Sequence, residues 1–133
     1  MITFSSSGQS SLGVEWEIAL ADRESGDLLP AAAELIRALE SSHPEFIDPE
    51  GLAPQITREY LSNTVEAVTG VCPTVADAMD QLTRLADALR AEADPLGVDL
   101  YSAGTHPYAQ WSEQPVSEKD RYQKVLERTQ YWG

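Results

Sequence analysis

Residues 12–20, LGVEWEIAL, alternate strictly between two kinds of side chain. One parity holds the large apolar residues Val14, Trp16, Ile18 and Leu20, and the other holds Gly13, Glu15, Glu17 and Ala19. A period of two predicts a β-strand with one buried face and one solvent-facing face. A parallel strand covered on both sides would instead be apolar throughout. The alternation therefore favours an α+β fold, in which a half-open sheet carries helices on its other face.

Two amphipathic helices are expected to cover that sheet. Residues 30–39 place alanine, leucine and isoleucine side chains on one helical face, which predicts the first helix. Residues 74–93 carry a longer apolar stripe and predict the second. Thr74 and Asp77 form a capping-box pattern at its start.

Further strands are expected on either side of the second helix. Residues 56–69 are β-branched and partly alternating, which predicts one strand with a bulge; a helix in its first half is the alternative. Residues 98–103 predict a short strand. The three prolines of 44–54 indicate a loop, and serine-rich residues 1–11 indicate a flexible N-terminus before a single domain, residues 12–133.

The charge balance excludes several functional classes. The 133 residues include 22 Asp and Glu against 9 Lys and Arg, which gives a net charge of −13. A nucleic-acid binder or a protein docked on an anionic membrane needs basic residues instead. The single cysteine, Cys72, excludes an internal disulfide framework and a cysteine-rich zinc site. No apolar run is long enough to span a membrane, and we expect no signal peptide and a cytoplasmic location.

Three glutamates are candidate metal ligands. Glu15 and Glu17 stand two residues apart on the predicted strand, so their carboxylates share a face at a Cα separation of roughly 6.6 Å. Glu66 lies among β-branched residues of another predicted strand. Three such carboxylates repel one another unless cations fill the cluster, and magnesium prefers oxygen ligands. The alternative is that these side chains form an ordinary solvated face.

A glycine-containing segment, Ser102-Ala-Gly-Thr-His-Pro107, follows the last predicted strand. Its backbone N–H groups, hydroxyls and imidazole could bind a carboxylate or a phosphate, which makes Gly104, Thr105 and His106 candidate substrate contacts. The segment is not a P-loop, because no lysine follows the glycine. For His106 alone, a role in holding the loop together by hydrogen bonds is the alternative.

The last 17 residues hold four of the nine basic side chains. Ser117 and Asp120 repeat the capping-box pattern and predict a third helix there. Its basic residues fit a solvated face or a contact with the acidic body of the protein. Binding of a phosphate or carboxylate by Arg121 is a further alternative.

Four blocks of sequence together resemble the type 2 glutamate–cysteine ligase family, whose members are carboxylate–amine ligases related to glutamine synthetase. The blocks are residues 13–17, residues 59–70, residues 102–107 with Trp111, and Arg121-Tyr122. The order and rough spacing of all four match, over most of the chain from residue 12 onward. Trp16 departs from the pattern, which usually has an acid there.

The resemblance implies a partial antiparallel sheet of a glutamine synthetase-like catalytic domain with helices on one face. It also implies ATP-dependent joining of L-glutamate to L-cysteine or another amine, through a γ-glutamyl phosphate and with Mg²⁺ bridging ATP. By position, Glu15, Glu17 and Glu66 would bind the metal, and Gly104, Thr105 and His106 would line the amino-acid or phosphate pocket.

Family members are much longer chains, so we expect an N-terminal fragment that carries part of the site and lacks activity by itself. The alternative hypothesis is a non-catalytic acidic interaction or dimerisation domain. In either case the edges of an incomplete sheet favour a homo-oligomer.

Overall fold

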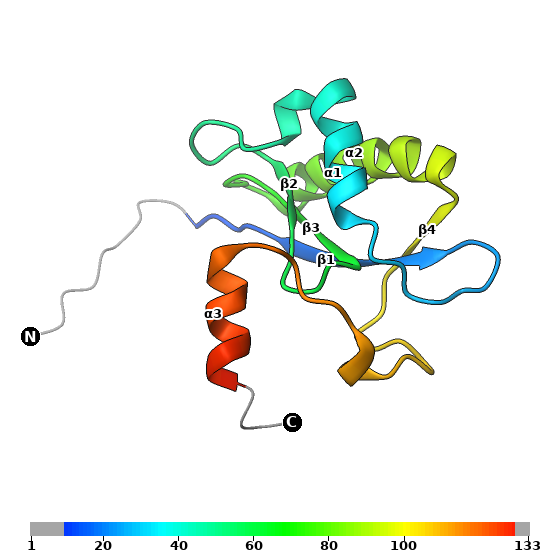
Figure 1. The fold of residues 1–133 in the computed structure, drawn as a ribbon. Coiled ribbons are helices and arrows are strands. Elements are labelled where there is room, and N and C mark those ends of the chain that lie inside the picture. Colours follow the sequence, from blue (N-terminus) through cyan, green and yellow to red (C-terminus); the bar gives the residue numbers. More distant parts are fainter. Residues whose placement is uncertain (1–9, 130–133) are drawn as a thin grey trace, which may run out of the picture.

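The computed structural model describes residues 10–129 as a four-stranded sheet with three α-helices and three short 3₁₀ turns (Figure 1). The elements follow one another along the chain as β1 (Glu15–Asp22), α1 (Ala32–Ser42), η1 (Pro44–Phe46), β2 (Gln55–Arg58), β3 (Thr64–Val68), α2 (Val75–Ala93), η2 (Asp94–Leu96), β4 (Val98–Tyr101), η3 (Trp111–Glu113) and α3 (Asp120–Thr129). This arrangement confirms the α+β class.

The strand order is β2-β3-β1-β4, and each neighbouring pair is antiparallel. The alternating stretch of the sequence thus becomes a central strand, although β1 begins at Glu15 and extends to Asp22. The segment before it is held by an isolated bridge between Leu12 and Cys72 and by the Thr69 N–H, which donates to the Val14 carbonyl at 2.9 Å.

The prediction of one strand over 56–69 was wrong, because the segment forms the hairpin of β2 and β3. The chain reverses over 59–63, where Thr64 donates its N–H to the Leu61 carbonyl at 3.2 Å. Asn63 lies buried in this reversal, and its amide donates to Gln114 Oε1 at 2.6 Å. The contact with a distant segment satisfies a polar group that would otherwise be buried without a partner.

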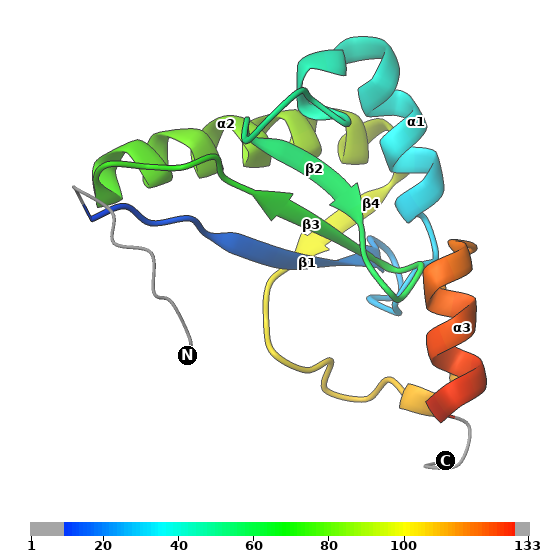
Figure 2. The same cartoon turned by 90° about the vertical axis from the view of Figure 1, so that its left-hand side faces the viewer.

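Helices α1 and α2 cover one face of the sheet, as expected, whereas α3 lies on the other side (Figure 2). The core between α1, α2 and the sheet includes the fully buried side chains Ile18, Leu20, Leu35, Leu39, Ile56, Val65, Leu85 and Leu89. Among the described residues, no helix packs on the opposite face of β1 and β3 as α1 and α2 do on the first, and this opposite face carries Glu15, Glu17 and Glu66. We call this second side the open face.

The start of α2 confirms its predicted cap, but the start of α3 does not. The Thr74 hydroxyl accepts the Asp77 N–H at 3.2 Å, and the Asp77 carboxylate accepts the Thr74 N–H at 3.0 Å. The predicted cap at Ser117 was wrong, because α3 begins only at Asp120. The Ser117 hydroxyl instead donates to the Glu59 carbonyl at 2.6 Å, which fixes this segment to the hairpin.

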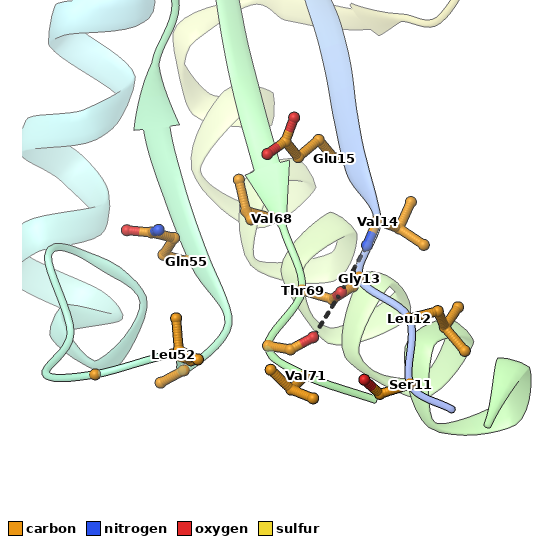
Figure 3. Close-up of a pocket in the computed structure, with 13 residues that line it drawn as sticks. Ser11, Leu12, Gly13, Val14, Glu15, Leu52, Gln55, Val68, Thr69 and Val71 are labelled. Atoms are coloured by element: carbon orange, nitrogen blue, oxygen red, sulfur yellow. Dashed lines mark hydrogen bonds between the residues drawn. The ribbon is translucent and has the colours of Figure 1, made fainter. Parts of the chain in front are cut away.

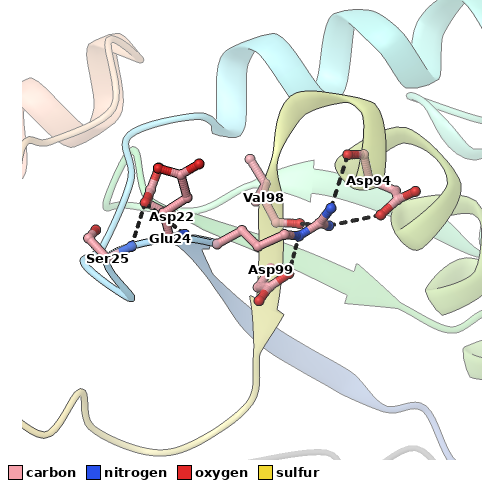
Figure 4. A network of polar contacts seen from close by, with 7 residues as sticks. Asp22, Glu24, Ser25, Asp94, Val98 and Asp99 are labelled. Atoms are coloured by element: carbon pink, nitrogen blue, oxygen red, sulfur yellow. Dashed lines mark hydrogen bonds and ion pairs between the residues drawn. The ribbon is translucent and has the colours of Figure 1, made fainter.

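Arg23 joins the end of β1 to the α2–β4 connection (Figure 4). Its guanidinium contacts the carboxylates of Asp94 and Asp99, each at 2.9 Å, and donates to the Val98 carbonyl at 3.4 Å. These groups are exposed, so the ion pairs add little stability individually. Their effect is to orient the edge strand β4 against β1.

Truncation of Leu20 to alanine tests the position of the core. Leu20 is 0% exposed, and we expect Leu20→Ala to lower the free energy of unfolding by about 2–5 kcal/mol. Leu52→Ala is the control, because Leu52 is 78% exposed, and its effect should stay within about 0.5 kcal/mol. Urea unfolding measures both; equal effects would contradict the assigned faces of β1.

Candidate functional site

The open face brings the three candidate metal ligands together on two neighbouring strands. Glu17 of β1 pairs directly with Glu66 of β3, and Glu15 pairs with Val68. Residues in direct cross-strand register have their Cβ atoms about 4.5–5.5 Å apart. Glu17 and Glu66 are therefore immediate neighbours, and Glu15 lies one step further along the same face.

Burial and the neighbouring negative charges act together on the Glu66 carboxyl. Partial burial raises its pKa above the ordinary value, and the negative charges of Glu59, Glu15 and Glu17 raise it further. The positive charge of Arg121 acts in the opposite direction. A bound cation would relieve the same repulsion, because it favours the charged form of all four carboxylates.

Within residues 10–129, no group of three or more His, Cys, Asp or Glu side chains is arranged to hold a metal ion. The structure thus brings Glu15, Glu17 and Glu66 to one face but not into one coordination sphere. Carboxylate oxygens are nevertheless the donors that Mg²⁺ prefers, and Mg²⁺ usually completes its shell with waters and substrate phosphates. The chemistry of the donor set fits this ion, and the ligand roles stay a prediction.

A pocket of about 360 Å³ lies beside Glu17 and joins two of the blocks that the sequence singled out. Its lining includes Glu17 from β1 together with Gly104, Thr105 and His106 from the loop after β4. Segments almost 90 residues apart in the chain thus meet because β4 pairs with β1. Sequence reasoning missed the other polar residues of the lining, Asn63, Thr64 and Gln114.

His106 uses both ring nitrogens within the protein. Its Nδ1 accepts the Ala109 N–H at 3.2 Å, and its Nε2 lies 3.0 Å from the Gly26 carbonyl oxygen. This pair of contacts requires a neutral ring that donates from Nε2. Tyr101 and Tyr108 pack edge-on against the ring. His106 therefore fixes the loop to the 24–27 turn and lines the pocket with its ring.

Gly104 and Thr105 are more accessible to a ligand than His106. A side chain added at Gly104 would meet no atom within 4 Å, so the backbone there is open to a ligand. Thr105 is exposed, and its carbonyl accepts the Tyr101 hydroxyl at 3.5 Å. The loop is thus held by aromatic rings, while its glycine and threonine remain accessible.

A second pocket, of about 450 Å³, lies at the start of β1 and includes Glu15 in its lining (Figure 3). Its floor is held by the Thr69 hydroxyl, which accepts the Val14 N–H at 2.9 Å and donates to the Gly70 carbonyl at 3.0 Å. Gly70 has to be glycine, because an added Cβ would stand 2.5 Å from the Leu52 carbonyl oxygen. Glu15 and Glu17 thus border different pockets.

The model of the glutamate–cysteine ligase family 2 matches residues 11–133. The chain belongs to this family. The match covers both pockets and every candidate residue of the open face.

Similar proteins are named provisionally as glutamate–cysteine ligase 2. One from Corynebacterium glutamicum strain R is 48% identical over 132 residues, which is 99% of this chain and 33% of that protein. Another from Rhodococcus jostii strain RHA1 is 50% identical over 133 residues, which is 34% of its length. The chain therefore spans about a third of the length of the curated relatives that it matches.

Membership of the glutamate–cysteine ligase family 2 agrees with the resemblance found in the sequence. Among the helices of residues 10–129, none is long and apolar enough to cross a membrane.

Replacement of Glu66 by glutamine tests the electrostatics of the open face. Since folding raises the pKa of Glu66 above 4.5, its charged form opposes folding at neutral pH, and this opposition disappears as acid protonates the carboxyl. Glu66→Gln should therefore be more stable than the parent at pH 7, by at most about 0.5 kcal/mol because solvent screens the site. The difference should shrink toward pH 4.

Urea unfolding at both pH values measures this effect. Glu40→Gln removes the same charge from an exposed position on α1 and is the control. A Glu66→Gln protein that is less stable than the parent at pH 7 would contradict the repulsion among these carboxylates.

Proposed function

We propose that the chain forms part of the active site of an ATP-dependent carboxylate–amine ligase that makes γ-glutamylcysteine. The observation that supports the proposal most strongly is the grouping of Glu15, Glu17 and Glu66 on an uncovered sheet face with a pocket at either end. We further propose that it works with Mg²⁺, ATP, L-glutamate and L-cysteine or another amine, in the cytoplasm.

The reaction has two steps in this proposal. A side-chain carboxylate oxygen of glutamate attacks the γ-phosphorus of ATP, forming γ-glutamyl phosphate and releasing ADP. The amine nitrogen of the second substrate then attacks the acyl carbon, loses a proton and expels inorganic phosphate, which leaves an amide bond.

The first step brings an anionic nucleophile to an anionic phosphate, so repulsion is the main barrier that the site must offset. Bound Mg²⁺ would supply positive charge to the phosphate oxygens. The part of this chain is to hold that charge with Glu15, Glu17 and Glu66 on a rigid sheet. Partial burial raises the pKa of Glu66, and the negative charges of Glu59, Glu15 and Glu17 add to this effect; their repulsion makes the face favourable for cations.

The pocket beside Glu17 is the proposed place of an amino-acid substrate or a phosphate. Gly104 and Thr105 can offer backbone and hydroxyl groups there, because both are exposed in the loop. His106 holds the loop in place and lines the pocket with its ring, because both of its ring nitrogens already have partners in the protein. Glu17 stands between this pocket and Glu66, so a ligand in the pocket would meet the proposed metal.

Thermal unfolding with Mg²⁺ and ATP tests the proposal. A ligand present at ten times its dissociation constant stabilises the folded state by about 1.4 kcal/mol, a shift of roughly 3–6 °C in Tm. We expect this shift in the parent chain and its loss in the double variant Glu15→Gln, Glu17→Gln.

The double variant Glu24→Gln, Glu40→Gln is the matched control, because it removes the same charge at exposed positions away from the open face. It should keep the shift. A shift that survives in the Glu15, Glu17 variant would refute the ligand roles, and no shift in the parent chain would favour the non-catalytic acidic interaction domain.

A further inference from the structure

The first turn of α3 is attached to the end of β2, beside the open face. Tyr122 is 5% exposed and packs edge-on against Tyr60, with ring centroids 5.5 Å apart. Its hydroxyl donates to the Arg58 carbonyl at 3.3 Å. The Lys119 ammonium donates to the same carbonyl at 3.1 Å and to the Thr57 hydroxyl at 3.3 Å. The buried ring and these bonds fix the helix start in place.

Two cationic side chains flank the Tyr122 ring as a result. The Arg121 guanidinium carbon lies 4.5 Å from the ring centroid, and the Lys119 nitrogen lies 5.6 Å from it. Arg121 also donates to the Tyr122 hydroxyl at 2.7 Å. Burial lowers the pKa of Lys119, and the positive charges of Arg58 and Arg121 lower it further. The three cations Arg58, Lys119 and Arg121 are therefore crowded where the start of α3 meets the end of β2.

In the described part of the chain, these cations form no ion pair with a carboxylate within 4.0 Å. Among residues 10–129, the ion pairs shorter than 4.0 Å involve Arg23, His43 and Arg90, but not Arg58, Lys119 or Arg121. The chain has 22 acidic residues for 9 basic ones, so partners are abundant. The negative charges of Asp48 and Glu59 act on Lys119 only beyond ion-pair distance. Crowded like charges cost free energy, and an anion bound between the cations would offset that cost.

Lys119 lies at one end of a row of cross-strand partners that leads to the proposed metal ligands. Thr57, which Lys119 contacts, is the cross-strand partner of Glu66, and Glu66 is the partner of Glu17. Neighbouring strands lie about 4.8 Å apart. Thr57, Glu66 and Glu17 therefore form a row across three neighbouring strands of the open face. A single extended anion could thus contact the cations at one end and a metal over the carboxylates at the other.

We propose that Lys119 and Arg121 form an anion-binding site at the β2 side of the open face, which takes the phosphate or carboxylate group of a ligand. Lys119 has three N–H donors, of which Thr57 and Arg58 occupy two. Arg121 has five donors in a planar fork, of which the Tyr122 hydroxyl occupies one. The fork suits bidentate contact with an oxyanion. The site extends the proposed ligase function, but binding of the anion does not require the metal.

Binding of two probes without Mg²⁺ tests the site. Tripolyphosphate represents the phosphate chain of a nucleotide, and L-glutamate represents an amino-acid carboxylate. We expect calorimetry to show that the parent chain binds at least one of them, and that Lys119→Gln, Arg121→Gln weakens binding at least tenfold. The preferred probe identifies the source of the oxyanion.

The control is Lys124→Gln, Arg128→Gln, which removes the same charge from exposed positions on the same helix. It should bind within threefold of the parent. Because Lys119 also anchors α3, the single variants Arg121→Gln and Arg121→Lys complete the set; Arg121→Lys should retain more affinity than Arg121→Gln.

Equal losses in the two double variants would overturn the proposal, since they would indicate attraction to helix charge in general. Failure of the parent chain to bind either probe would overturn it as well. The variant Glu15→Gln, Glu17→Gln should still bind the probe without Mg²⁺. This result separates the anion site from the metal site, whichever of the two fails.

Discussion

The structure depends on the two-sided character of β1. This strand is paired on both sides, by β3 and β4, so its side chains decide which face of the whole sheet is buried. Ile18 and Leu20 are buried against α1 and α2, and their parity forces Glu15 and Glu17 to the open face. A slip of one residue in register would bury both carboxylates and expose the core residues. Packing energy thus fixes the position of the charges.

The burial of one face of β1 also places glutamate carboxylates beside two pockets. Glu15 borders the pocket at the start of β1, and Glu17 borders the pocket formed with the loop after β4. Glu66 lies beside Glu17 on the neighbouring strand. A ligand in either pocket would therefore lie beside a glutamate of the open face.

Periodicity and caps were sufficient for the parts of the fold that local sequence determines. The central strand, α1 and α2 follow from apolar patterns, and Thr74 caps α2 as its spacing predicts. The hairpin within 56–69 and the role of Ser117 were mistaken, because both depend on contacts between distant segments. Binding of a phosphate or carboxylate by Arg121 was an alternative from the sequence, but the grouping of Lys119 with Arg121 around Tyr122 was missed for the same reason. Only the docking of α3 on β2 brings Lys119 and Arg121 to the open face.

The carboxylates of Glu15, Glu17 and Glu66 and the cations Lys119 and Arg121 can be understood as one electrostatic arrangement. Each group is unfavourable alone: burial and then repulsion between like charges raise the pKa of Glu66 on one side and lower that of Lys119 on the other. The two groups do not neutralise each other by ion pairs within residues 10–129, although Thr57 and Glu66 are neighbours. A metal-bound anion laid along the row would place positive charge over the carboxylates and negative charge by Lys119 and Arg121. Under the two proposals, one bound ligand would relieve both repulsions at once.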